Sequence, residues 1–324
     1  MIGVTGANGL LGKFVMEGLT SQSIPCFGIK RPTSDTSHFK DLSIDWKQAD
    51  ILDLTSLQEA VKGATTIVHT AALVSFKSND DELLYKTNVE GTRNVVNACL
   101  QQGVDRLIHI SSVAALGRQK GVTEIDEGHR WVESKLNSAY AESKYLAELE
   151  VYRGQEEGLK IDIVNPSVIL SQSDWDRSSS QLFKYAWKNR PFYTKGSINY
   201  VDVRDVVKII FSMIKSEASG DRIIANAGVI SLKDFLNEVA IRFNKKPPHI
   251  LVSPSLVSAF AYLELIRSKL MGKEPIVTPQ SARTANEKFF YKNQKAIQEY
   301  GIQFQSLANT LDWCCAYYAK QMLQ

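Results

Sequence analysis

Cysteine is scarce in this chain, and its four cysteines are not spaced to bind a metal. They are Cys26, Cys99, Cys314 and Cys315 among 324 residues, with no zinc-ligand spacing. Adjacent cysteines in a helix cannot form an ordinary structural disulfide, so the last two are expected to stay reduced. We therefore expect a cytoplasmic protein with free thiols, and no signal peptide, because Met1 leads straight into an apolar segment.

Long hydrophobic runs and runs of one charge are also missing. The most apolar stretch, Ile250–Ile266, is interrupted by serines, a proline and Glu264, and is shorter than the ~20 apolar residues of a membrane span. We expect a helix beside the substrate there and no integral membrane segment, with peripheral membrane contact left open. The net charge is only +3 and there is no basic tract, which argues against nucleic acid as a partner.

The chain does contain a regular alternation of strand-like and helix-like segments. Apolar runs such as Ile161–Val164 alternate with segments of helical periodicity up to about residue 165. This order predicts an α/β fold, a Rossmann-type doubly wound parallel sheet with a smaller, mostly helical C-terminal substrate lobe. We assign residues 1–167 and about 200–230 to the sheet domain, and residues 168–199 and about 231–324 to the substrate lobe.

Three glycines connect the first predicted strand, Met1–Thr5, to the first predicted helix, Leu10–Leu19. The first glycine permits a tight turn, the second lets the backbone approach a pyrophosphate, and the third lets the helix pack closely on the strand. Amides at the helix N-terminus then bind the anion. We predict a dinucleotide phosphate loop, although the spacing departs from G-x-G-x-x-G and an ordinary glycine turn is the alternative. Its contacts would be Gly6, Asn8, Gly9, Leu10, Leu11 and Gly12.

The end of the second predicted strand indicates which dinucleotide binds. An NAD site usually places an acidic residue there, but residues 24–34 contain none. Instead Lys30 and Arg31 follow the strand, and an arginine can pair with a 2′-phosphate through two hydrogen bonds. We therefore predict NADP(H) in preference to NAD(H), with solvated surface cations as the alternative. Asp50 and Ile51, after the third predicted strand, are candidate contacts to adenine, whereas Asp53 could be a helix cap.

A tyrosine and a lysine one helical turn apart indicate the chemistry. Tyr140 and Lys144 lie at i and i+4 of a predicted helix, Ala139–Glu150. A phenol has a reference pKa near ~10, and we expect the Lys144 ammonium and a positively charged nicotinamide to lower it. Ser112, after the apolar strand Arg106–Ser111, would hydrogen-bond the substrate oxygen. We predict that Ser112, Tyr140 and Lys144 are catalytic.

The Tyr-x-x-x-Lys spacing alone is not specific, because the chain has a second such pair. Tyr291 and Lys295 lie among charged residues, where we expect a solvated surface segment. His69 and His109 lie in apolar strands, and we expect core histidines there in preference to metal ligands.

The order of these motifs resembles that of the extended short-chain dehydrogenases/reductases, the NAD-dependent epimerase/dehydratase family. The resemblance runs from the first residue to about residue 207. Its motifs are Thr5–Gly12, Val68–Ala72, Asn88–Thr92, His109–Gly117, Tyr140–Lys144, Asn165–Ser167 and Tyr200–Val206. The later segments Leu251–Leu270 and Gly272–Thr278 resemble the branch that contains dihydroflavonol reductases and 3β-hydroxysteroid dehydrogenases.

This resemblance implies roles for individual residues. Ser112, Tyr140 and Lys144 would form the catalytic triad, with Lys144 also bonding the nicotinamide ribose. Further cofactor contacts would come from Ala71, Ala72 and Pro166, and Arg31 matches the arginine used on the 2′-phosphate. Asn88 would support the site through hydrogen bonds, with packing inside a helix as an equal alternative. The helices near Asp81–Gln102 and Ala139–Gly154 form the family's usual dimer surface, so a homodimer is expected.

Three functions remain open from the sequence. The favoured one is an NADP(H)-dependent oxidoreductase that reduces a carbonyl, or oxidises a secondary alcohol, of a small substrate, with Tyr140 as proton donor. The second is a nucleotide-sugar epimerase or dehydratase, for which Arg177, Arg190 and Arg283 could bind a diphosphate. The third is a non-catalytic NADP-sensing protein. An apolar or aromatic substrate is indicated by the apolar residues of the specificity segments, Val74, Phe76, Leu116, Trp131, Trp187, Phe192, Phe260 and Tyr262.

Overall fold

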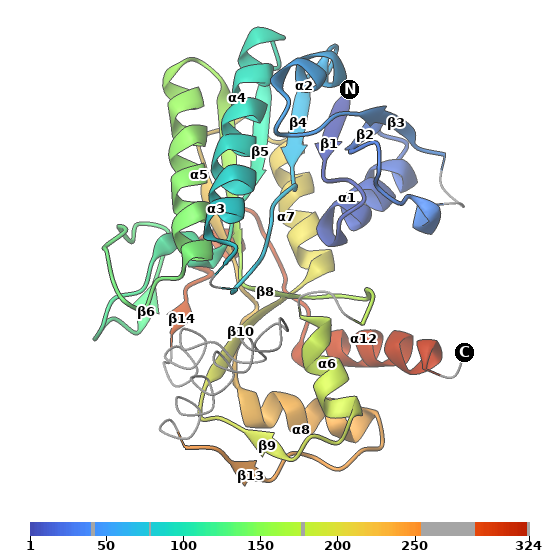
Figure 1. Cartoon of the computed structure of the whole chain (residues 1–324), viewed down its shortest axis with the longest axis vertical. Helices are drawn as coiled ribbons and strands as arrows, with labels where there is room; N and C mark the ends of the chain where they lie inside the picture. Colours follow the sequence, from blue (N-terminus) through green and yellow to red (C-terminus); the bar gives the residue numbers. More distant parts are fainter. Residues whose placement is uncertain (40–42, 78, 176–178, 254–288, 323–324) are drawn as a thin grey trace.

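A parallel seven-stranded sheet forms the centre of the molecule (Figure 1). The computed structural model describes residues 1–39, 43–77, 79–175, 179–253 and 289–322. The strand order is β11-β7-β5-β4-β1-β2-β3, and every neighbouring pair is parallel. The strands are β1 (Ile2–Thr5), β2 (Cys26–Lys30), β3 (Asp45–Gln48), β4 (Thr66–His69), β5 (Arg106–Ile110), β7 (Lys160–Pro166) and β11 (Arg222–Ala225).

Helices cover both faces of this sheet (Figure 1). On one face lie α1 (Leu10–Ser21) and α7 (Val203–Lys215), and on the other α2 (Leu54–Val61), α4 (Gly91–Gln101) and α5 (Ala139–Glu156). Successive residues of β5 point to opposite faces, so Ile108 packs with α1 and α7 while Leu107 packs with α2 and α4. Burial on both faces explains why the strands read as continuous apolar runs, and the predicted fold class is confirmed.

A smaller group of elements packs below the carboxyl ends of the strands in Figure 1. Its three-stranded sheet has the order β12-β10-β8, built from β8 (Val168–Leu170), β10 (Ser197–Asp202) and β12 (Gly228–Ser231). The helices are α6 (Ser180–Trp187), α8 (Leu232–Arg242) and α12 (Leu307–Gln321). Phe183, Phe235 and Tyr318 are fully buried between them and form an aromatic core separate from those of the main sheet.

Short elements join distant parts of the chain. The strands β9 (Phe192–Tyr193) and β13 (Ile250–Leu251) pair, as do β6 (Glu124–Ile125) and β14 (Phe290–Tyr291). Helix α11 is Gln294–Gln298, and 3-10 turns span Ser37–Phe39 and Val113–Leu116. No helix among the described residues is both long and apolar enough to cross a membrane.

The segment expected as one helix near Asp81–Gln102 has an irregular middle. It consists of α3 (Asp81–Leu84), a π-helical turn (Tyr85–Glu90) and α4. The wide turn contains Asn88, whose side chain is buried toward helix α5. A π turn inside a helix often marks a functional site.

The expectation of a solvated surface segment at Tyr291 is wrong. Tyr291 is only 1% exposed, because β14 pairs with β6 and its ring is enclosed there. Lys295 forms an ion pair with Asp221 at 2.8 Å. Among the charged neighbours, Lys292 follows this two-residue strand and forms an ion pair with the exposed Glu124 at 3.1 Å, so a charge beside the tyrosine did not mean that the tyrosine itself is exposed.

Several sequence predictions fall outside the described residues. The helix expected over Ile250–Ile266 enters the range 254–288, and only its first residues are described, with Ile250 and Leu251 in β13. Phe260, Tyr262, Arg177 and Arg283 also lie outside the described ranges.

Candidate active site

The loop from β1 to α1 has a shape that requires glycines. Gly6 has a φ of +64°, and a Cβ there would lie 2.7 Å from the backbone of Ala71. A Cβ on Gly12 would lie 2.2 Å from the carbonyl oxygen of Gly6. The loop closes through the Gly9 amide, which donates to the Gly6 carbonyl at 2.8 Å. Gly12 therefore permits close packing as predicted, and its nearest neighbour is the turn itself.

The first amides of α1 have no side-chain cap. Its N-cap is Gly9, which has no side chain to bond the first amides, and the first turn carries no acidic residue. Thr70 Oγ1 donates to the carbonyl of Thr5 at 2.7 Å and holds the loop against β4. Asn8 and Leu10 are half-buried at the turn, whereas the Leu11 side chain packs into the core.

The ends of β2 and β3 lie at the same edge of the sheet as this loop. Lys30 Nζ donates to the carbonyl of Ser34 at 3.3 Å, whereas Arg31 is exposed. Asp50 Oδ1 accepts from the Leu52 amide at 3.0 Å, with Ile51 half-buried beside it. Asp53 caps α2 by accepting from the Thr55 amide, which was the alternative foreseen for it.

Ser112, Tyr140 and Lys144 lie together at the carboxyl end of β5. Ser112 begins the 3-10 turn after this strand, and its hydroxyl lies close enough to that of Tyr140 to lower the pKa of the phenol. Helix α5 starts just before Tyr140, because Ser138 caps it by accepting from the Ala141 amide. One turn further, Lys144 is 1% exposed and donates from Nζ to the carbonyl of Ile110 at 2.8 Å. The structure thus brings the three predicted residues together.

Burial controls the protonation of this group. It raises the pKa of the Tyr140 hydroxyl, and the hydrogen bond with Ser112 offsets only part of that rise. The expected lowering of this pKa by Lys144 is wrong for the protein itself, because the ammonium group bonds Ile110 and burial dominates. Burial also lowers the pKa of Lys144 to about 8, against the opposing charge of Glu148. At neutral pH the phenol is protonated and can donate a proton.

Asn88 connects the loop after β4 to the catalytic helix. Its Oδ1 accepts from the Leu73 amide at 2.7 Å, and its Nδ2 donates to the Leu73 carbonyl and to Ser143 Oγ, both at 2.9 Å. The hydrogen-bonding role is therefore present, beyond packing inside a helix. The same loop carries Ala71, Ala72 and Phe76, and the Phe76 ring lies edge-on to Tyr140 at 5.7 Å between centroids. Pro166 ends the neighbouring strand β7.

The two strand histidines are core residues, as predicted. His69 is hydrogen-bonded to Thr5 Oγ1 at 2.6 Å and to Thr92 Oγ1 at 3.1 Å. Burial lowers the pKa of His69 to about 3 and also lowers that of His109, so both rings are neutral. Within the described ranges, no cluster of three His, Cys, Asp or Glu side chains could hold a metal ion.

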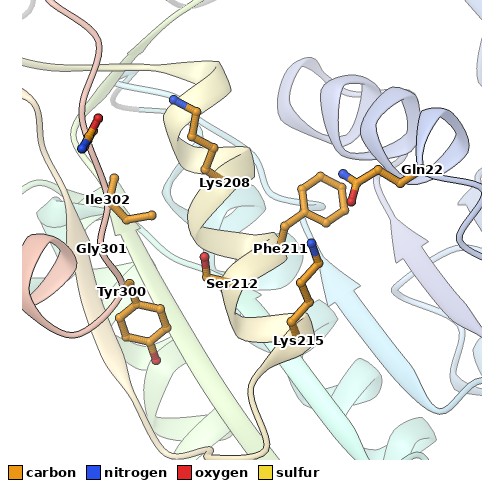
Figure 2. A pocket seen from close by; sticks show the side chains of 9 residues that line it. Gln22, Lys208, Phe211, Ser212, Lys215, Tyr300, Gly301 and Ile302 are labelled. Atoms are coloured by element: carbon orange, nitrogen blue, oxygen red, sulfur yellow. The ribbon is translucent and has the colours of Figure 1, made fainter.

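The hollow in Figure 2 lies away from this site. It is bounded by α7, the C-terminal end of α1 and residues 300–303. Lys208 and Lys215 of α7 lie on its wall, with Gln22 to one side of that helix and Tyr300 to the other. None of the predicted site residues lines it, so it is not the dinucleotide site.

Sequence reasoning missed several buried polar residues that hold the site together. Thr70 supports the phosphate loop, and Asn165 Nδ2 donates to the carbonyl of Ser112 at 2.8 Å. Glu148 is buried one turn beyond Lys144 and accepts from both Asn165 and Arg222. Its spacing from Lys144 was a usable signal, because both lie on one face of the helix.

Comparisons with known proteins show the family of this chain. A sequence model of the NAD dependent epimerase/dehydratase family matches residues 2–228. A Synechocystis sp. protein provisionally named dihydroflavonol 4-reductase is 30% identical over 322 residues, covering 96% of this chain and 93% of that protein.

Solved structures show the same fold over the whole chain. The crystal structure of gox2253 has a TM-score of 0.85 at 31% identity and covers 99% of this chain and 98% of its own. UDP-glucose 4-epimerase from Thermotoga maritima has a TM-score of 0.80 at 16% identity, with 99% of both chains covered, and shows the fold alone. On the family match and on the named relative, this chain is an NAD(P)-dependent oxidoreductase that belongs to the NAD-dependent epimerase/dehydratase family, the extended short-chain dehydrogenases/reductases.

Proposed function

We propose that this protein reduces the carbonyl group of a small apolar or aromatic substrate with NADPH, with Tyr140 as the proton donor. The observation that carries the proposal is that the hydroxyls of Ser112 and Tyr140 lie together at the end of β5, where the buried Lys144 bonds the Ile110 carbonyl. When bound, the reduced nicotinamide supplies the hydride. The same groups run the reverse oxidation of a secondary alcohol.

Each residue of the group has a separate task. The Ser112 hydroxyl lies within hydrogen-bonding reach of Tyr140, so one substrate oxygen can bond both. Tyr140 donates its proton to that oxygen as negative charge develops there. The Lys144 ammonium then stabilises the phenolate left behind, and in a site this buried its charge acts strongly. Lys144 would also bond the nicotinamide ribose.

The preference for NADPH rests on the end of β2. Arg31 is exposed beside the edge that carries the phosphate loop, where a 2′-phosphate would lie. An arginine pairs with phosphate through two parallel hydrogen bonds. Asp50 and Ile51 would border the adenine from the end of β3, and Ala71, Ala72 and Pro166 would line the way to the nicotinamide.

The apolar substrate class rests on what surrounds Tyr140. The Phe76 side chain is 55% exposed while its ring touches that of Tyr140, so an aromatic surface faces the reacting group. The name of the Synechocystis relative refers to dihydroflavonol, which is likewise an aromatic compound. We place the substrate between this loop and a lobe made of residues 168–199 and about 231–324.

We further propose a cytoplasmic homodimer with α4 and α5 at its interface. Leu149 is an exposed apolar residue on α5, and Arg93 of α4 pairs with Glu150 beside it at 2.8 Å. Both helices continue the same outer surface of the molecule, which two copies can share. Sedimentation of wild type and Leu149→Asp tests this, because a charge at an apolar interface should yield monomers.

The deciding experiment measures NADPH oxidation with aromatic and aliphatic aldehydes and ketones, for wild type, Tyr140→Phe and Tyr145→Phe. Tyr145 is on the same helix, with its ring stacked on Trp131 at 4.6 Å, and is the matched control. Tyr140→Phe should lose activity by about 10²–10⁴-fold and keep NADPH affinity, because only the proton donor is removed. Tyr145→Phe should stay active.

Two results would contradict the proposal. Full activity of Tyr140→Phe would exclude it as the proton donor. Conversion of a nucleotide sugar without net use of NADPH, and no carbonyl reduction, would favour an epimerase or dehydratase instead.

A further inference from the structure

We propose that Glu148 is a positioning residue of this site: its buried carboxylate keeps Lys144 charged and, through Asn165, fixes the backbone of Ser112. This proposal rests on the proposed function, because that function assigns catalytic roles to Lys144 and Ser112. Glu148 itself touches neither substrate nor cofactor.

Glu148 is a buried acid in the interior of the protein, with only 1% of its side chain exposed. Both of its oxygens are occupied by donors. Oε1 accepts from Asn165 Nδ2 and Oε2 accepts from Arg222 NH2, each at 2.6 Å. A carboxylate held by two short hydrogen bonds is fixed in position.

One of these bonds leads to the candidate active site. Asn165 Nδ2 also donates to the carbonyl of Ser112 at 2.8 Å. Two residues earlier in the chain, the carbonyl of Ile110 accepts from Lys144. The backbone that carries Ser112 is therefore held at two carbonyls, by Lys144 and by the Glu148–Asn165 pair. Loss of the pair would free the Ser112 hydroxyl to move away from Tyr140.

The second role is electrostatic. Lys144 lies one helical turn before Glu148, and it faces His109 of β5 and His69 of β4 across the helix–sheet contact. Both imidazoles are neutral and Tyr140 is a protonated phenol, so none of these three groups offsets the ammonium charge. Glu148 supplies the negative charge that opposes the effect of burial on the pKa of Lys144.

Arg222 complicates any test by single substitution. Its guanidinium pairs with Glu148 and its side chain is only 18% exposed, so removal of the acid alone leaves a poorly solvated cation. Replacing both partners by neutral residues removes that problem, because a buried ion pair can often be exchanged for uncharged side chains with little loss of stability. The double variant therefore separates the role in folding from the role in the site.

The experiment compares wild type, Glu148→Gln, Glu148→Gln with Arg222→Met, and Glu156→Gln. Glu156 is on the same helix but exposed, and serves as the control. The protonation midpoint of Lys144 is followed by NMR of protein labelled with ¹³C at lysine Cε, assigned with Lys144→Met. This readout needs neither substrate nor cofactor. The pH dependence of kcat for NADPH-driven carbonyl reduction is measured in parallel.

We expect the wild-type midpoint near the pKa of about 8. In both Glu148 variants it should fall by about one pH unit or more, as the loss of a close opposite charge does. The pH above which kcat declines should fall by a similar amount. Glu156→Gln should change neither the Lys144 midpoint nor this pH. Asn165→Leu should lower kcat about tenfold with the Lys144 midpoint and the KM for NADPH unchanged, because it removes the tie to Ser112 while the Glu148 carboxylate remains in place, held by Arg222.

The proposal is overturned if the double variant folds like wild type and keeps both the wild-type Lys144 midpoint and the wild-type pH profile. Glu148 would then serve the fold alone. If the Lys144 midpoint falls in the Glu148 variants but the wild type reduces no carbonyl compound, the effect of Glu148 on the charge of Lys144 is supported. The proposed function is then the part that fails.

Discussion

Replacing Lys144 with methionine should make the protein more stable while it removes the chemistry. Lys144 is 1% exposed, and burial lowers its pKa from 10.5 to about 8. The folded chain therefore holds the ammonium form less favourably than the unfolded chain does. Methionine has a similar length and no charge, so the substitution removes that penalty.

The size of the effect follows from the two pKa values. At about 1.4 kcal/mol for each tenfold change in proton affinity, the fall from 10.5 to about 8 represents about 3 kcal/mol of lost stability below pH 8. The variant also gives up the hydrogen bond to Ile110, which contributes about 1 kcal/mol. The net gain at pH 7 is about 2 kcal/mol. Between about pH 8 and 10.5 the unfolded chain binds more protons than the folded one, so wild-type stability rises with pH and the difference shrinks.

Urea unfolding followed by tryptophan fluorescence measures this directly, at pH 7 and again at pH 10. Lys144→Arg is the control, because an arginine stays charged at both pH values and should give no gain. The reasoning fails if Lys144→Met is less stable than wild type at pH 7, or if its advantage is the same at both pH values.

Three further predictions concern the cofactor and the substrate. Gly12→Ala should abolish dinucleotide binding and lower Tm, because its Cβ would lie 2.2 Å from the Gly6 carbonyl oxygen. Gly128→Ala should change neither, because the nearest atom to its Cβ would be a carboxylate oxygen of Asp126 at 3.4 Å. Phe76→Ala should raise the KM for aromatic carbonyl compounds several-fold and leave the KM for NADPH unchanged. An unchanged KM for the aromatic compounds would exclude a contact between Phe76 and the substrate. Arg31→Ala should weaken NADPH binding by about ten- to a hundredfold in a fluorescence titration, as expected for a charge-assisted pair worth roughly 1.5–3 kcal/mol, with NADH little affected. Equal wild-type affinity for both dinucleotides would refute that assignment.

Local sequence patterns were sufficient for the parts of the fold that depend on near neighbours. The strand before Gly6, the helix after it and the start of α5 at Ser138 follow from periodicity, turn chemistry and capping. The pairing of Tyr140 with Lys144 follows from the helical repeat. Each of these features is decided within about one or two helical turns.

Features decided by distant contacts were not predictable in the same way. Helix α5 carries several glutamates, and Glu148 differs from the exposed Glu156 because Arg222, 74 residues away, reaches it. The direction of the Tyr140 pKa depends on where the Lys144 ammonium donates its hydrogen bond. Tyr291 was misplaced because a two-residue strand has no periodicity to detect.

The pairing of β6 with β14 has a consequence for exchanging parts between relatives. The amide of Phe290 donates to the Thr123 carbonyl at 2.7 Å, and that of Lys292 donates to the Ile125 carbonyl at 2.8 Å. Segments more than 160 residues apart in the chain are thereby joined, one just before the catalytic helix and one near the C-terminus. A chimera that receives only the C-terminal part of a relative would pair β6 of one protein with β14 of another. A graft intended to transfer substrate preference should therefore carry residues 123–125 with residues 289–292 as a single module.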